Sequence, residues 1–72
     1  MFRFQAIILG ISQIHEKKTY IVLLSQEYGR CTSWWNKKNI SGFDIGDIVE
    51  VFIERDRSIN IIKNMELQIS SW

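Results

Sequence analysis

Aromatic rings and cations lie close together in the middle of the chain. Trp34 and Trp35 end an extended run that begins at Arg30, and Lys37 and Lys38 follow soon after it. Single-stranded nucleic acids are bound by aromatic side chains on which bases stack and by cations that contact phosphates. This run is therefore a candidate binding strand, in which the cations position a nucleic-acid backbone without reading its sequence.

The two tryptophans are adjacent, and this limits how they can be used. Neighbouring residues of a strand point to opposite faces of a sheet, so we expect one ring in the core and the other on the surface. The sequence does not indicate which of Trp34 and Trp35 faces outward, and both are candidates for stacking. The alternative is that both rings are packing residues and that the neighbouring cations are solvated.

No pattern in the sequence indicates catalysis. A closed zinc site takes four ligands, and the chain has one histidine, His15, and one cysteine, Cys31. A cysteine flanked by strand residues is more often an inert buried thiol than a nucleophile. The sequence has no glycine-rich phosphate loop and no metal-ligand spacing. We therefore expect no enzyme activity, no catalytic residue, no metal and no cofactor.

A β-hairpin is expected to carry the candidate strand. The apolar run Tyr20 to Leu24 is followed by the polar tetrad Gln26 to Gly29 and then by the second extended run. Gly29 stands where the loop needs a positive φ. Gly10 lies inside the first apolar segment, where an interior glycine often marks a bulge or a bend.

The rest of the chain predicts further strands and little or no helix. Alternating polarity predicts strands at residues 2–11, 47–54, 59–62 and 65–69. Polar connections are expected at residues 36–46 and 55–58, and the polar residues 12–19 are expected to form a loop or the splayed tip of a hairpin. Five strands, or six, with a long first strand predict an all-β fold: one domain, residues 1–72, forming a small five-stranded OB-fold (Greek-key) barrel. An SH3-like barrel is the main alternative, because periodicity alone does not separate the two.

The first loop and the charge distribution add candidates. OB-folds commonly bind oligonucleotides with the loop after the first strand, which here carries Lys17 and Lys18. The net charge is only +1, but residues 1–38 carry six basic against two acidic residues and residues 39–72 carry three against six. This asymmetry favours one basic face. Short apolar runs and a single cysteine predict a cytoplasmic protein without a membrane span.

Several segments of the chain resemble the N-terminal OB-fold domain of the bacterial recombination mediator RecO. That domain has an apolar "IVL" strand, a Glu-containing loop and an "IVxLLTEEYGR"-like hairpin. The corresponding residues here are Ala6 to Leu9, Glu16 and Tyr20 to Arg30, at the same spacing. An alternating strand, an arginine turn and an "L-T-x-x-E"-like end match Ile48 to Ile53, Arg57 and Ile62 to Glu66. The family's basic K-G-A-R-R-like segment is here Trp35-Asn36-Lys37-Lys38-Asn39, without the glycine.

The resemblance implies a function and partners. RecO-like proteins bind single-stranded and duplex DNA, anneal strands and load recombinase in recombinational DNA repair. The implied partners are DNA and a RecR-like or single-strand-binding protein. Two alternatives stay open: a protein–protein assembly module, and an S1-type RNA-binding barrel of the initiation factor one kind, to which Gly46 to Val51 is similar.

Overall fold

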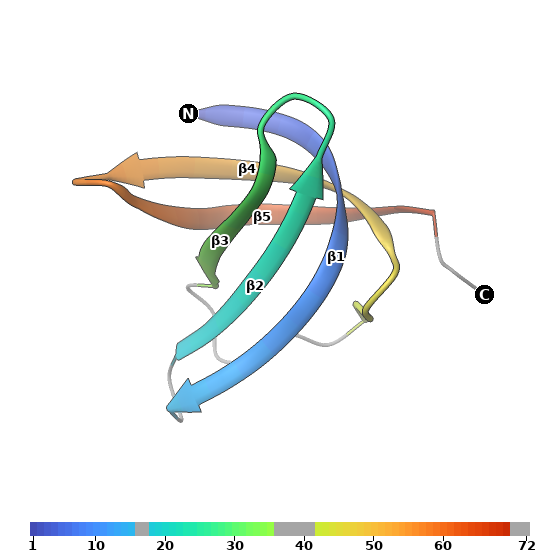
Figure 1. Ribbon diagram of the computed structural model, residues 1–72, viewed down its shortest axis with the longest axis horizontal. Helices are drawn as coiled ribbons and strands as arrows, with labels where there is room; N and C mark the ends of the chain where they lie inside the picture. Colours follow the sequence, from blue (N-terminus) through green and yellow to red (C-terminus); the bar gives the residue numbers. More distant parts are fainter. Residues whose placement is uncertain (16–17, 36–41, 70–72) are drawn as a thin grey trace.

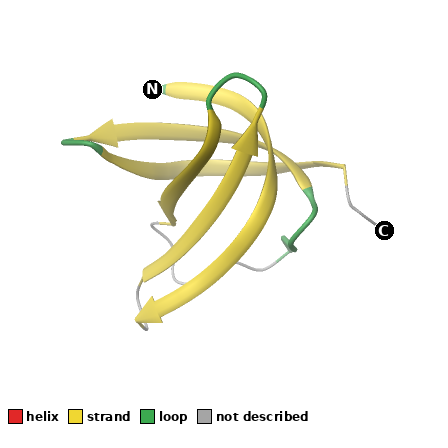
Figure 2. Cartoon of the chain, viewed as in Figure 1, coloured by secondary structure: helices red, strands yellow, loops and turns green. Residues whose placement is uncertain are grey.

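Five strands form a closed barrel in the computed structural model, which describes residues 1–15, 18–35 and 42–69 (Figure 1). The strands are β1 (Phe2–His15), β2 (Lys18–Ser25), β3 (Gly29–Trp35), β4 (Ile48–Asp56) and β5 (Ile59–Ile69). Their order around the barrel is β1-β2-β3-β5-β4, consistent with an OB-like fold. The described residues contain no helix (Figure 2), and hence none long and apolar enough to cross a membrane. The predicted all-β barrel of five strands is confirmed.

Strand β1 belongs to both halves of the barrel. Its first part, from Phe2 to Ile7, pairs with β4, and its second part, from Ile7 onward, pairs with β2. The register between β1 and β2 shifts between Ile8 and Gly10, as expected for a β-bulge that bends the strand. The predicted irregularity at Gly10 is therefore confirmed, and it lets one strand turn from one partner to the other.

The barrel closes through a short parallel contact between β3 and β5. In the described part of this seam the ladder consists of two residue pairs, Trp34 with Ile61 and Trp35 with Ile62. The earlier residues of β3 have their ladder partners on β2 alone. At the end of the barrel where β3 begins, β3 and β5 therefore have no ladder pairs within the described residues.

The core follows the alternation of the strands. Its members are Phe4, Ala6, Ile8, Ile21, Leu23, Trp35, Val49, Val51, Ile53, Ile62 and Met65. Leu23 is completely buried, and such a side chain typically contributes about 2–5 kcal/mol over alanine. This core holds the strands in one register, so the outward side chains have fixed neighbours.

The connection before β4 is anchored to the bulge of β1. The Gly46 amide donates to the Ile8 carbonyl at 2.8 Å, and the Ile8 amide donates to the Asp47 carbonyl at 3.0 Å. The Asp44 amide donates to Asp47 Oδ2 at 2.9 Å, and Asp47 is buried. The Phe43 ring packs edge-on against Trp35, 6.2 Å between centroids, and is partly buried against the core.

Three predicted boundaries differ from the structure. Residues 12–15 and 18–19, for which a loop or the tip of a hairpin is expected, continue the ladder of β1 and β2, with Ser12 opposite Tyr20, so the hairpin alternative holds for them. Backbone pairing does not depend on side-chain polarity, which explains why a strand forms here without an apolar pattern. The expected turn at residues 55–58 shrinks to Arg57 and Ser58, and β5 runs without a break.

Candidate nucleic-acid interface

The outer face of the β2–β3 hairpin carries three of the predicted binding residues that the structure describes, Lys18, Arg30 and Trp34, whereas Trp35 lies in the core. Thr19, Ile21, Leu23 and Ser25 of β2 point into the barrel and are buried. The intervening side chains point outward and, with their counterparts on β3, form what we call the outer hairpin face. It consists of Lys18, Tyr20, Val22, Leu24, Arg30, Thr32 and Trp34.

The two tryptophans lie on opposite sides of β3, as predicted. Trp35 is only 6% exposed and packs in the core with Phe43. Trp34 is half-buried on the outer hairpin face, opposite Tyr20. The core position of Trp35 removes it from the candidates for base stacking and leaves Trp34 for that role.

Trp34 is held in a cluster with Tyr20 and Lys18. The Tyr20 and Trp34 ring centroids lie 3.7 Å apart, with the ring planes inclined by 43°. Lys18 Nζ lies 5.3 Å from the Trp34 ring centroid, a cation–π contact that contributes about 0.5–1 kcal/mol at an exposed site. The cluster joins two aromatic rings and one cation on a rigid pair of strands.

Arg30 lies on the same face at the other end of β3. It is exposed and pairs with Leu24, beside the hairpin loop. It lies four positions before Trp34, which corresponds to about 13 Å along a strand. The outer hairpin face therefore has a cation near each end, with the aromatic pair beside one of them.

Among the described residues, the charged side chains of the outer hairpin face differ from those of the other strands. The outer hairpin face has Lys18 and Arg30 but no carboxylate, and neither cation forms an ion pair within the described residues. By contrast, Arg3 lies 3.5 Å from Glu50, and Lys63 lies 3.4 Å from Glu54. The cations of the hairpin are thus available to a polyanion.

Three predicted binding residues lie outside the described residues: Lys17, Lys37 and Lys38. In the sequence, Lys17 directly precedes β2, and Lys37 follows the end of β3 by two residues. Of the predicted set, the structure brings together Lys18 and Trp34 and places Arg30 on the same face.

Sequence reasoning missed Tyr20 as a member of the site. The signal was present, because a hairpin in which Ser25 faces Gly29 places Tyr20 opposite Trp34 when the ladder is counted back. In the sequence Tyr20 stands out only as the first residue of an apolar run. Its ring makes the outward tryptophan one of a pair.

The Cys31 thiol is partly buried on β3. Burial raises the pKa of the Cys31 thiol, and the Ser33 hydroxyl opposes this only in part. Ser33 Oγ is fully buried and makes no hydrogen bond of regular geometry there, so burial is the dominant influence. A raised pKa leaves the thiol protonated at neutral pH and a poor nucleophile. No group of three or more His, Cys, Asp or Glu that could hold a metal occurs among the described residues.

Fold and face together define a small OB-like barrel with an aromatic and basic outer hairpin face. Neither a protein-family model, nor a curated protein, nor a solved structure matches the chain. The likeness to the RecO N-terminal domain therefore rests on the short sequence segments alone.

Proposed function

We propose that this chain is a sequence-tolerant module for binding single-stranded DNA, with the outer hairpin face as its binding surface. The observation that carries the proposal is the contact of Trp34 with Tyr20 and Lys18. Aromatic rings on which bases stack, next to cations that follow the backbone, are the two components of such sites.

Each component has a distinct part in binding. A base that stacks on the Trp34–Tyr20 pair contributes about 1–3 kcal/mol, and any base suffices because each has an aromatic face. Lys18 and Arg30 bind phosphates, which releases counterions and makes the affinity fall with added salt. Since the two rings already contact each other, little side-chain freedom is lost when a strand binds.

The resemblance to RecO supports a role in recombinational DNA repair. In that role the module anneals strands and loads recombinase together with a RecR-like or single-strand-binding protein, in the cytoplasm. Phosphate contacts do not depend on strandedness, so duplex DNA is a second and weaker substrate. RNA is the competing ligand of the same face, because stacking accepts bases of either kind.

A second candidate function, protein–protein assembly, is favoured by an exposed apolar strip. Ile7, Leu9 and Leu24 are exposed on β1 and β2, and Ile7 pairs directly with Leu24. Clustered exposed apolar side chains often mark surfaces that bind another protein. In this case the barrel oligomerises or binds a partner without nucleic acid.

A tryptophan-fluorescence titration with oligo-dT and oligo-U at two salt concentrations tests the proposal. We expect saturable binding of oligo-dT that weakens with salt, and a loss of affinity in Trp34→Ala but not in the control Gln68→Ala, since Gln68 is exposed on β5, outside the outer hairpin face. Binding of oligo-U in preference to oligo-dT would assign the face to RNA. Absence of binding to either strand, with a concentration-dependent oligomer in sedimentation, would favour the assembly function instead.

A further inference from the structure

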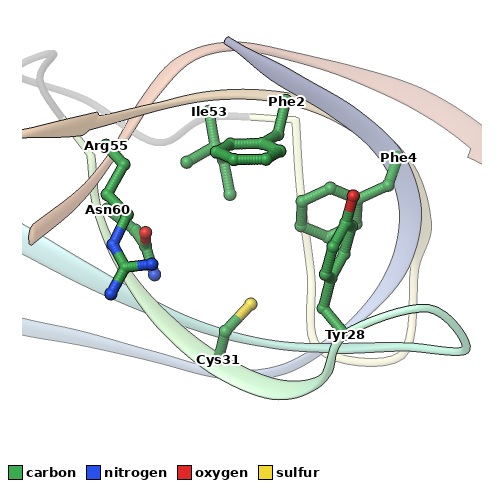
Figure 3. Close-up of a pocket in the computed structure, with 7 residues that line it drawn as sticks. All are labelled: Phe2, Phe4, Tyr28, Cys31, Ile53, Arg55 and Asn60. Carbon is green, nitrogen blue, oxygen red and sulfur yellow. The ribbon is translucent and has the colours of Figure 1, made fainter. Parts of the chain in front are cut away.

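An open cavity of about 380 Å³ lies at the end of the barrel where β3 and β5 are not paired (Figure 3). Its walls come from the start of β1, the loop after β2, the start of β3, and the β4–β5 hairpin. Cavities of this size accept one small ring system and its substituents. The mechanism proposed for the outer hairpin face does not use this cavity.

One wall of the cavity is aromatic. The Tyr28 ring lies edge-on to Phe4 at 4.9 Å and to Phe2 at 6.0 Å between centroids. The Tyr28 amide donates to Ser25 Oγ at 2.9 Å, which holds the loop in place. Phe2 and Tyr28 nevertheless stay 44% and 51% exposed, so the aromatic surface is preformed but not covered.

The opposite wall is polar. Arg55 and Asn60 are register partners on β4 and β5, and both line the cavity across from the aromatic rings (Figure 3). Neither side chain makes a hydrogen bond or an ion pair within the described residues. An arginine offers donors for an anion, and an asparagine amide offers one acceptor and two donor hydrogens.

The cavity and the stacking cluster lie on opposite faces of β3. Cys31, whose thiol points into the cavity in Figure 3, is three positions before the outward Trp34. Asn60, which also lines the cavity, directly precedes Ile61, the parallel partner of Trp34. In the described residues, the edge of β3 before Trp34 has no ladder partner on β5, so one strand of nucleic acid can pass over this edge from the outer hairpin face to the cavity.

On the basis of the proposed function, we propose that this cavity binds one unstacked nucleobase of the strand whose neighbouring bases stack on Trp34 and Tyr20. The ring lies against Tyr28 and Phe4, the Asn60 amide bonds to the base edge, and Arg55 binds the adjacent phosphate. A nucleotide can stack its base on the rings, bond the base edge to the amide and place its phosphate on the guanidinium. An aromatic side chain of a protein can stack on the rings, and tyrosine or tryptophan can also bond to the amide, but none carries an anion for Arg55. We therefore assign the cavity to a base. The module then prefers certain bases at one position of an otherwise tolerant site.

The first test uses nucleotides small enough to enter the cavity alone. The four deoxynucleoside 5′-monophosphates are titrated against the labelled protein, and backbone amide shifts are followed by NMR. We expect shifts at Tyr28, Cys31 and Asn60 and unequal affinities among the four. N-acetylphenylalanine amide serves as the competing probe. Stronger shifts at these residues with this probe than with any nucleotide would overturn the assignment and favour a protein ligand.

The second test compares two asparagines of β5. Asn60→Ala is expected to lower the affinity for the preferred homo-oligomer by about five- to hundredfold and to abolish the preference among homo-oligomers. Asn64→Ala is the matched control, because Asn64 is exposed on the same strand and does not line the cavity. Equal oligomer affinities for these two variants, with a loss only in Trp34→Ala, would overturn the base pocket and leave the proposed function intact. If nucleotides bind in the cavity while Trp34→Ala binds oligo-dT as tightly as wild type does, the base pocket is supported. The same result would refute the proposal that the outer hairpin face binds DNA.

The charged wall provides an independent comparison. Arg55→Gln is expected to lower the salt dependence of oligomer binding by about one phosphate interaction, a change of about 0.7 in the slope. Arg57→Asn removes the same charge at the neighbouring turn, outside the cavity, and is expected to leave the slope unchanged. A slope in Arg55→Gln equal to that of wild type would contradict the phosphate interaction.

Discussion

The ring of Tyr20 lies 3.7 Å from the ring of Trp34, centroid to centroid, directly across the β2–β3 ladder. The pairing of Ser25 with Gly29 at the turn sets this register, and every residue of the hairpin is counted from it. A slip by one residue would bring Trp34 to the inside and Trp35 to the surface. The hairpin loop therefore fixes which tryptophan shares a face with Tyr20.

Substitution of the two tryptophans separates packing from binding. Trp35→Ala leaves a cavity in the core and is expected to cost about 3–5 kcal/mol, enough to unfold a domain of this size. Trp34→Ala is expected to leave the melting temperature nearly unchanged and to weaken oligo-dT binding by about 1–3 kcal/mol. Thermal melts and fluorescence titrations measure the two effects. Equal destabilisation by both substitutions, without a separate loss of binding, would refute the stacking role of Trp34.

The hairpin loop depends on the backbone conformation of Gly29. Its φ is +70°, and an added Cβ would meet no atom within 4 Å, so strain and not a clash opposes a side chain there. Gly29→Val is expected to destabilise the fold by more than about 1 kcal/mol. Gly10→Ala is the control, since its Cβ would meet Val22 only at 4.0 Å, an ordinary contact. Chemical denaturation of both variants measures the difference, and a Gly29→Val protein as stable as wild type would contradict it.

The lysines that follow β3 in the sequence are expected to bind phosphates. Lys37→Ala combined with Lys38→Ala should weaken oligonucleotide binding and lower the slope of log affinity against log salt by about 0.7 for each phosphate that the variant no longer neutralises. Lys63→Ala is the control, because Lys63 pairs with Glu54 and lies on β5. An unchanged slope in the double variant would show that these two lysines only face solvent.

The turn between β4 and β5 is strained. Arg57 and Ser58 have φ of 51° and 75°, as a two-residue hairpin turn requires, although neither is a glycine. Arg57→Asn with Ser58→Gly supplies the residues that such turns prefer and is expected to stabilise the fold by about 0.5–1 kcal/mol. A differential scanning measurement should show a melting temperature several degrees higher. A lower melting temperature would contradict the strain.

The Cys31 thiol makes stability depend on alkaline pH. Burial holds its pKa above the ordinary value of 9.0, so the folded state binds this proton more tightly than the unfolded state does. The stabilisation is therefore complete below that value and is lost as the pH rises through the higher pKa of the folded state. The difference in unfolding free energy between wild type and Cys31→Ala should be constant up to about pH 8 and decrease above pH 9. A constant difference across this range would contradict the shift.

Local patterns predicted the strands, the Gly29 loop and the bulge at Gly10, because alternation and glycine positions act over a few residues. The inward direction of Trp35 was not predictable from them. Both faces of β2 are apolar, since Ile21 and Leu23 alternate with Tyr20 and Leu24, and so the sequence does not distinguish the core face from the outer one. The choice is made by packing against the rest of the core, of which the β4 and β5 residues lie far away in the sequence.

The cavity was likewise beyond sequence reasoning. Phe2, Tyr28 and Asn60 come from three distant segments, and only the closure of the barrel brings them to one end. Their types are ordinary for a strand and a loop, so no local spacing marks them. By contrast, the basic character of the hairpin was visible in the charge asymmetry between the two halves of the chain.

The shared strand β1 has a consequence for how the chain folds. The β2–β3 and β4–β5 hairpins join neighbouring segments, whereas the pairing of Phe2 with Ile53 closes a loop that contains most of the chain. Closing such a loop costs more entropy than closing a hairpin, so we expect the two hairpins to form early and the β1–β4 ladder to form late. Because Phe2 and Phe4 reach their places only with that last step, the stacking pair on the hairpin can exist in partly folded chains that still lack the barrel-end cavity.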